Sequence, residues 1–152
     1  MATVNQRVFI ESLPTFVQQE VVLRGWVCRM RVLGKTIFIV LKDCSGEVQC
    51  VAAPESIKEH HLKLEDAVEI VGRVRREARA KAGYELDILQ VRVLNRSGQH
   101  LPFNSFSNLD SVGPETLMEY RPLALRNEVI GDIFRVQAAL LRFFREFLTQ
   151  RR

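Results

Sequence analysis

Four side chains in one short stretch of the sequence could together bind a single-stranded nucleic acid. Phe38 has a flat ring on which a base can stack, and Gln49 has an amide that can form hydrogen bonds with the edge of a base. Arg29 and Arg31, just upstream, carry positive charges that attract phosphates. We therefore interpret this stretch as a surface for single-stranded nucleic acid, provided that the fold turns these side chains toward solvent.

The alternation of side chains along two predicted strands decides which way they face. Successive side chains of a strand point to opposite faces of the sheet. Phe38 lies between the apolar residues Ile37 and Ile39, so its ring is expected on the face opposite to theirs. In the next strand Gln49 alternates in the same way with its apolar neighbours. The pattern predicts an aromatic ring and an amide that look outward from adjoining strands.

The order of the predicted elements is that of an OB fold, a small and partly open β-barrel. A short helix or irregular connection separates the third strand from the fourth and is expected to pack through Ile57, Leu62 and Leu64. We predict a mainly β chain in which a five-stranded OB-fold barrel is followed by a linker and a C-terminal helix. The strands are expected near residues 20–31, 35–42, 46–53, 66–78 and 84–95.

A second basic group is expected in the loop between the fourth and fifth strands, where OB folds grip nucleic acid. It contains Arg75, Arg76, Arg79 and Lys81. Phosphate contacts from such residues would raise affinity and salt dependence without selecting a base. The alternative is an ordinary basic hairpin, because Glu77 partly offsets the charge.

After Ser97 the sequence changes character. The segment 98–127 begins with a run rich in Ser, Asn, Pro and Gly, which is typical of a linker between two bodies. From residue 128 onward apolar residues recur at helical spacing, and Asn127 is placed to cap that helix. We predict a barrel domain at 1–97, a hinge at 98–127, and a helix at 128–152 whose wide apolar face lacks a partner.

Composition limits what the chain can be. Its 152 residues, 47% of them apolar, and its net charge of +4 fit a small globular domain with an appendage and a mild preference for polyanions. Three cysteines without CxxC spacing, no signal peptide and no membrane span are typical of a reduced, cytoplasmic protein. His60 and His61 lack metal-ligand spacing, and no nucleophile motif is visible. We assign no catalytic, metal or cofactor residues.

Two blocks of the sequence resemble one family, in the order and spacing found there. Residues 25–51, GWVCRMRVLGKTIFIVLKDCSGEVQCV, resemble the anticodon-binding N-terminal domain of aspartyl-tRNA synthetases, whose outline the asparaginyl and lysyl enzymes share. The runs EYRPLALRN (119–127) and IFRVQAALLRFFREFL (133–148) are similar to the start of the class II catalytic domain of the aspartyl and asparaginyl enzymes. The run VRVLN followed by LPF is closer to the archaeal, non-discriminating aspartyl type, or to its asparaginyl relatives, than to the usual bacterial enzyme.

The resemblance implies a partner and gives roles to individual side chains. In the family, the phenylalanine that matches Phe38 stacks on an anticodon base, and the glutamine that matches Gln49 forms a hydrogen bond with the middle uridine. The arginines that match Arg29 and Arg31 contact the anticodon stem-loop. The expected partner is therefore the anticodon stem-loop of tRNA for aspartate, asparagine or both. Arg76, Arg79 and Lys81 complete the predicted RNA-binding set.

The sequence also departs from the family. Ala124 stands where the family usually has an acidic residue, and the later catalytic segments, including the one that holds ATP, are absent. We therefore expect no aminoacylation from this chain alone. The resemblance implies that the parent enzyme is a homodimeric, ATP-dependent aminoacyl-tRNA ligase, with ATP and Mg²⁺ bound in the missing part. In this chain the apolar face of the C-terminal helix is expected to cause self-association or disorder.

Several interpretations stay open at this point. The chain could be the tRNA-binding part of a longer aspartyl ligase, or a stand-alone derivative of that part. It could equally belong to an asparaginyl enzyme, because the two anticodons share their first two bases. A generic OB protein that binds single strands without anticodon preference is the remaining alternative.

Overall fold

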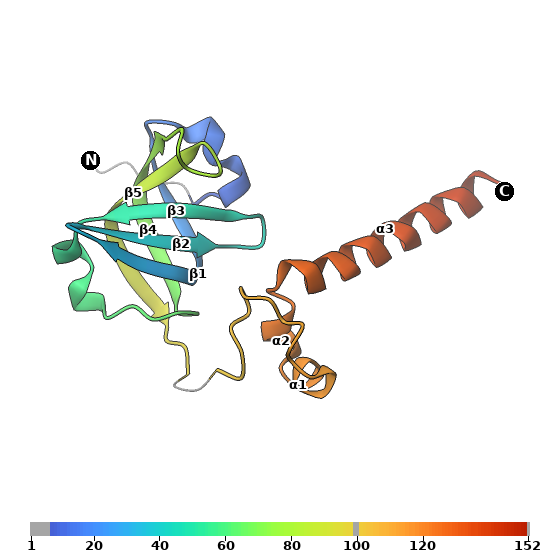
Figure 1. Cartoon of the computed structure of the whole chain (residues 1–152). Helices are drawn as coiled ribbons and strands as arrows, with labels where there is room; N and C mark the ends of the chain where they lie inside the picture. The colour runs from blue at the N-terminus through green and yellow to red at the C-terminus, as the bar shows by residue number, and fades with distance from the viewer. Residues whose placement is uncertain (1–6, 99–100, 152) are drawn as a thin grey trace. The chain divides into compact units, whose positions relative to one another are not determined.

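The computed structural model describes residues 7–98 and 101–151, and the chain divides into two compact units that meet in the sequence at residues 99 and 100 (Figure 1). Residues 1–6 of the predicted barrel domain (1–97), residues 99–100 of the predicted hinge (98–127) and residue 152 of the predicted helix (128–152) lie outside the described residues. The first unit contains the β-structure and the second contains the three α-helices.

The first unit is a closed β-barrel with the strand order β1-β2-β3-β5-β4 (Figure 1). Neighbouring strands are antiparallel except for β3 and β5, which pair in parallel. This arrangement confirms the predicted five-stranded OB fold. The strands of the described residues are β1 (Glu20–Leu33), β2 (Thr36–Lys42), β3 (Glu47–Ala52), β4 (Ala67–Arg76) and β5 (Tyr84–Asn95).

Alternating apolar side chains fill the barrel, as the sequence predicts for β2 and β3. Ile39, Leu41 and Cys50 are completely buried, and the residues between them are partly exposed on the outer face. The polypeptide before β1 contributes to the same core, because the 3-10 helix η1 (Ile10–Phe16) buries Leu13 there. The inner face of the barrel is therefore apolar, and the outer face is left for polar and aromatic side chains.

The predicted helical connection between the third and fourth strands consists of two 3-10 turns, η2 (Pro54–Ser56) and η3 (Lys58–His60). Ile57 and Leu62 are buried there, as predicted. Leu64 is not: it is 42% exposed, because the chain turns at Glu65, whose φ is 65°, before it enters β4.

Two glycines allow the strands to approach one another closely. A Cβ atom at Gly72 in β4 would lie 2.6 Å from Cγ of Leu86 and 2.7 Å from the carbonyl oxygen of Asp87 in β5. A Cβ atom at Gly25 in β1 would overlap the carbonyl oxygen of Lys42 in β2. Any larger residue at these two positions would force neighbouring strands of the barrel apart.

The second unit consists of α1 (Pro114–Glu119), α2 (Arg121–Ala124) and the long helix α3 (Glu128–Gln150). Its small core is formed by Phe103, Leu109 and Ala124. Two short helices and a core therefore occupy part of the segment that the sequence predicts as a hinge. The hinge boundaries themselves remain a prediction.

The start of α3 is fixed by the side chain that the sequence predicts as its cap. Oδ1 of Asn127 accepts a hydrogen bond from the backbone N–H of Val129 (3.1 Å), and Nδ2 donates to the carbonyl oxygens of Ser105 and Ser107. Within its own unit α3 buries none of its residues. None of the helices in the described residues is both long enough and apolar enough to cross a membrane.

Candidate nucleic-acid interface

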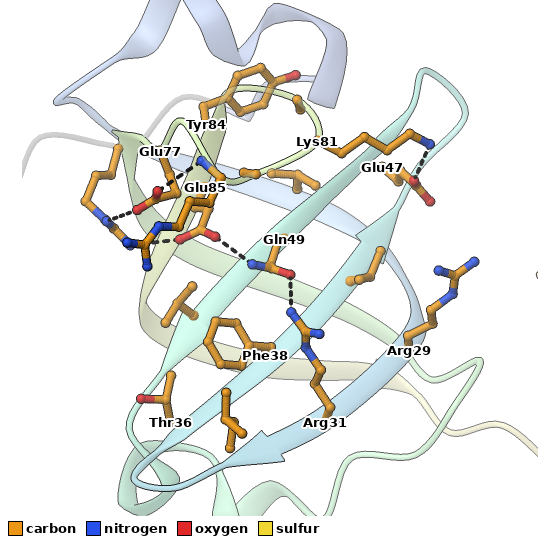
Figure 2. Close-up of a pocket in the computed structure, with 18 residues that line it drawn as sticks. Arg29, Arg31, Thr36, Phe38, Glu47, Gln49, Glu77, Lys81, Tyr84 and Glu85 are labelled. Atoms are coloured by element: carbon orange, nitrogen blue, oxygen red, sulfur yellow. Dashed lines mark hydrogen bonds and ion pairs between the residues drawn. The ribbon is translucent and has the colours of Figure 1, made fainter.

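A hollow of about 860 Å³ lies on the outer face of the barrel (Figure 2). Its floor is formed by outward side chains of β1, β2 and β3, and one side is formed by the loop from Glu77 to Gly83, which joins β4 to β5. The hollow brings together six of the seven side chains that the sequence predicts for RNA binding. These are Arg29, Arg31, Phe38, Gln49, Arg79 and Lys81.

Arg76, the seventh predicted residue, does not line the hollow. The predicted fourth strand, 66–78, contains Arg75 and Arg76, although the sequence also groups them with the basic loop that follows. In the structure they are the last two residues of β4. Consecutive residues of a strand point to opposite faces, so only one of the two can face the hollow. Arg75 is the residue that does so.

Arg31 and Phe38 form the aromatic part of the hollow. They are direct partners across the antiparallel pair of β1 and β2. The guanidinium carbon of Arg31 lies 4.9 Å from the centroid of the Phe38 ring, which is a cation–π contact. The ring is thus presented on the outer face as the alternation predicts, and one of its faces is already covered by a planar cation.

Gln49 lies on the same outer face, one strand further along (Figure 2). Val40 is its partner on β2, two residues beyond Phe38. The Oε1 atom of Gln49 accepts a hydrogen bond from Nη2 of Arg31 (3.2 Å), and its Nε2 atom donates to Oε1 of Glu85 (2.6 Å). Both ends of this amide are therefore held by charged neighbours from other strands.

Arg75 anchors the far end of this hydrogen-bonded chain. Its Nη2 donates to Oε2 of Glu85 (2.8 Å), Nη1 donates to Oε2 of Glu77 (3.1 Å), and Nε donates to the carboxylate of Asp87 (3.2 Å). Burial alone would lower the pKa of Arg75, but the carboxylates of Asp87, Glu85 and Glu77 outweigh it and raise the pKa. Arg75 is held by three carboxylates and is fixed in place on the wall of the hollow.

The register of the barrel aligns these side chains in two neighbouring rows. Because Arg75 pairs with Glu85 and Glu85 pairs with Gln49, one row crosses β4, β5 and β3 and continues through Val40 to Arg29 on β1. The adjacent row is formed by Arg73, Asp87, Val51, Phe38 and Arg31.

Sequence reasoning did not identify Glu85 as a member of the site. Only the parallel pairing of β3 with β5 brings it to Gln49.

The rim of the hollow is basic and open. Lys81 is 91% exposed and pairs with Glu47 on β3 at 3.3 Å, a contact that water screens. The backbone N–H of Arg79 donates to Glu77 and, together with Arg75, lowers the pKa of that carboxyl. The lining contains five basic and three acidic side chains, so its net charge favours an anionic ligand.

Two of the three cysteines of the barrel, Cys28 and Cys50, are buried. Burial raises the pKa of Cys28 and Cys50 well above the ordinary range of a thiol, which keeps both protonated. Cys44 is exposed, and all three thiols are free. Across residues 7–98 and 101–151 there is no group of three or more His, Cys, Asp or Glu side chains that could hold a metal ion.

A closed five-stranded barrel with an aromatic ring, an amide and arginines on one outer face defines an OB-fold protein of the nucleic-acid-binding class. Residues 21–94 match the family described as OB-fold nucleic acid binding domain.

Comparisons over nearly the whole chain narrow the family further. The chain is 34% identical over 151 residues to the asparagine–tRNA ligase of Thermus thermophilus (95% of this chain, 34% of that protein). It is 31% identical over 142 residues to the aspartate–tRNA(Asp/Asn) ligase of Methanococcus maripaludis (90% and 32%). The solved asparaginyl-tRNA synthetase of Pyrococcus horikoshii, with bound asparaginyl-adenylate, superposes with a TM-score of 0.84 at 27% identity (97% and 35%).

The chain belongs to the aspartyl- and asparaginyl-tRNA synthetase family, and its barrel is the N-terminal anticodon-binding OB domain of that family. The similar proteins are divided between the aspartyl and asparaginyl branches. The chain spans about a third of the length of the curated relatives that it matches.

Proposed function

We propose that the barrel binds the anticodon stem-loop of a tRNA for aspartate, asparagine or both. The observation that carries the proposal is the common outward face of the Phe38 ring and the Gln49 amide, inside a hollow with a net basic lining. A stem-loop offers unstacked bases in a sharply curved, negatively charged loop, which suits this combination of ring, amide and cations. The family relationship supports the same partner.

Each side chain has a distinct role in this proposal. An anticodon base stacks on Phe38, and Gln49 forms a hydrogen bond with the base edge. Arg31, which now covers the ring, shifts toward the phosphates or remains as the outer layer of a stack. Arg29, Arg79 and Lys81 contact phosphates from β1 and from the β4–β5 loop. Arg76 contacts phosphates only where the RNA backbone extends beyond the hollow.

We propose an aspartyl enzyme of the archaeal, non-discriminating type as the parent protein, with an asparaginyl enzyme as the second candidate. The relatives divided between both branches support either assignment. The whole protein would then be a homodimeric, cytoplasmic ligase that uses ATP and Mg²⁺ in a catalytic core outside this chain. Residues 98–127 would form its hinge, and residues 128–152 would form the first helix of its class II catalytic domain.

Gel shifts with tRNA transcripts test the proposed function directly. The chain should bind transcripts for aspartate and asparagine more tightly than a transcript whose anticodon has been replaced. Tight binding to only one of the two would assign the branch. An excess of poly-pyrimidine RNA should not displace the cognate transcript from this chain. From a generic single-strand binder, which has no anticodon preference, the same excess would displace it. Equal affinity for all RNAs would refute the proposed function.

A further inference from the structure

The β3–β4 connection (residues 53–66) lies against the exit segment (residues 96–98), in which the chain leaves the barrel after β5 (Figure 1). Arg96 joins the two segments. Its Nη2 atom donates to the carbonyl oxygen of His60 (2.6 Å), and its Nη1 atom donates to the carbonyl oxygen of His61 (3.0 Å) and to Oδ2 of Asp66 (3.0 Å). One guanidinium thus binds three acceptors of the connection.

Asp66 adds a second link between the same two segments. Its Oδ1 atom accepts from the backbone N–H of Ser97 (2.8 Å), and its Oδ2 atom accepts from the backbone N–H of Lys63 (2.9 Å). The side chain is fully buried, and a buried carboxylate requires such partners to remain charged. The carbonyl oxygen of Asp66 also accepts from the backbone N–H of Val27 on β1 (3.0 Å). Both links are therefore anchored on the wall of the barrel.

The connection needs this support, because its backbone is strained. Three non-glycine residues have a positive φ in the part of the chain that the structure describes, and two of them lie here: His61 (φ 42°) and Glu65 (φ 65°). A left-handed conformation is unfavourable for a residue with a Cβ atom, and it persists only where the surrounding contacts impose it. Arg96 binds the carbonyl oxygens of the connection at one of these two strained points.

We propose that Arg96 is a latch that joins the β3–β4 connection and the exit segment into one cooperative unit. While the latch is closed, each segment supplies contacts that hold the other on the barrel, so an open latch releases both. The proposal goes beyond the proposed function, because it concerns how the chain leaves the barrel and requires no RNA. A Cβ atom at Gly98 would contact nothing within 4 Å. Free movement after the barrel therefore begins at Gly98 with the latch closed, and at residue 96 with the latch open.

Amide hydrogen exchange of the full chain, followed for single residues by NMR, tests the latch. Arg96→Met keeps most of the length of the side chain but removes all of its hydrogen-bond donors. We expect the hydrogen-bonded amides of His60, Lys63 and Ser97 to exchange about tenfold faster in this variant, all three by a similar factor. The shared factor is what a cooperative unit requires. If the three rates are unchanged, or if one segment responds without the other, the proposal is wrong.

Arg92→Met is the matched control, because Arg92 lies on β5 and holds the carboxylate of Glu69 on β4 instead of the connection. It should leave the three amides at their wild-type rates. The amide of Val74, which donates to the carbonyl oxygen of Gln19 in another part of the barrel, reports unfolding of the whole barrel. Its rate should be the same in the wild type and in Arg96→Met. An equal acceleration at Val74 would show general destabilisation and would refute a local latch.

A milder variant keeps the test valid if Arg96→Met does not fold. Arg96→Lys retains the positive charge beside Asp66, but one ammonium group lacks the fixed fork of donors that reaches three acceptors. We expect about a threefold acceleration, again shared by the three amides. Wild-type rates in a folded Arg96→Lys would refute the latch.

Backbone ¹⁵N relaxation locates the start of free movement after the barrel. Fast motion should begin at Gly98 in the wild type and at residue 96 in a folded variant of Arg96. The same starting point in both chains would refute the role of the latch at the exit segment.

Discussion

Arg31 and Phe38 face each other across β1 and β2, and the guanidinium carbon of Arg31 lies over the aromatic ring, 4.9 Å from its centroid. The same guanidinium donates to the carbonyl of Gln49. A planar, hydrogen-bonding group thus covers one face of the ring and contacts the amide at the same time. Arg31 therefore links the ring on β2 to the amide on β3.

Replacing Phe38 by Ala should weaken RNA binding by about one to two orders of magnitude at fixed salt. A stacked base contributes about 1 to 3 kcal/mol, and the variant removes the stacking surface. Filter binding with a cognate transcript measures the loss. Phe38→Tyr is the matched control, because it keeps the ring on the outer face and should bind nearly as well as the wild type. Unchanged affinity of Phe38→Ala would exclude this ring as the stacking platform.

Replacing Gln49 by Ala should mainly erode the preference among anticodon variants. The amide is proposed to read a base edge, whereas affinity for the backbone comes from the surrounding cations. Titration of transcripts with each of the four bases at the middle anticodon position measures the preference. We expect the four affinities to converge within about threefold of one another. An equal loss of affinity for all four transcripts would contradict a role in base reading.

Replacing Lys81 by Ala should reduce the salt dependence of RNA binding without changing base preference. Lys81 is almost fully exposed on the rim, and removing one phosphate contact lowers the slope of log K against log salt by roughly one. Arg76→Ala is the comparison, because Arg76 is nearby in the sequence but lies outside the hollow. A slope that changes more for Arg76→Ala than for Lys81→Ala would place the RNA backbone on the other side of β4.

Asp66 should make the barrel sensitive to acid. Its side chain is completely buried and accepts from the backbone N–H groups of Ser97 (2.8 Å) and Lys63 (2.9 Å) and from Nη1 of Arg96 (3.0 Å). Burial alone would raise the pKa of Asp66, but these hydrogen bonds outweigh it and lower the pKa.

A carboxyl whose pKa is lower in the folded state stabilises the fold when it is ionised. The contribution of Asp66 is therefore fully present above about pH 4, the ordinary value for aspartate, and is lost as the pH falls further. Asp66→Asn should lower the free energy of unfolding by about 2 to 3 kcal/mol near neutral pH and should flatten the loss of stability in acid. Urea titrations between neutral pH and about pH 3 measure both effects, with the exposed Glu59→Gln as control. A parallel pH profile for Asp66→Asn and the wild type would disprove this assignment.

The apolar face of α3 should drive self-association of this chain. Leu141 and Phe144 are 65% and 62% exposed within their unit, and other large apolar residues of the helix are similarly open. Sedimentation should give a mass above that of a monomer, and Leu141→Glu should restore the monomer. Arg145→Glu, on the same helix, controls for the change in charge. A monomeric wild-type chain with α3 rigidly ordered in solution would contradict this expectation.

The sequence by itself determined the local features of the barrel and of its surface. Alternation with a period of two is a property of any extended chain, so the apolar residues of β2 and β3 predicted which face Phe38 and Gln49 would occupy. The approximate bounds of the strands and the cap at Asn127 followed from residue types that act over a few positions. The resemblance in residues 25–51 supplied the family, which the comparisons support.

Only the tertiary structure decided which side chains meet across the barrel. Arg75 and Glu85 belong to an antiparallel pair, but the contact between Glu85 and Gln49 depends on the parallel pairing of β5 with β3, 36 positions apart in the sequence. The register of two distant strands is set by closure of the whole barrel and by packing of its core, and no local pattern specifies it. The sequence also grouped Arg75 with Arg76 in one basic loop, whereas β4 continues through both residues and its alternation turns them to opposite faces.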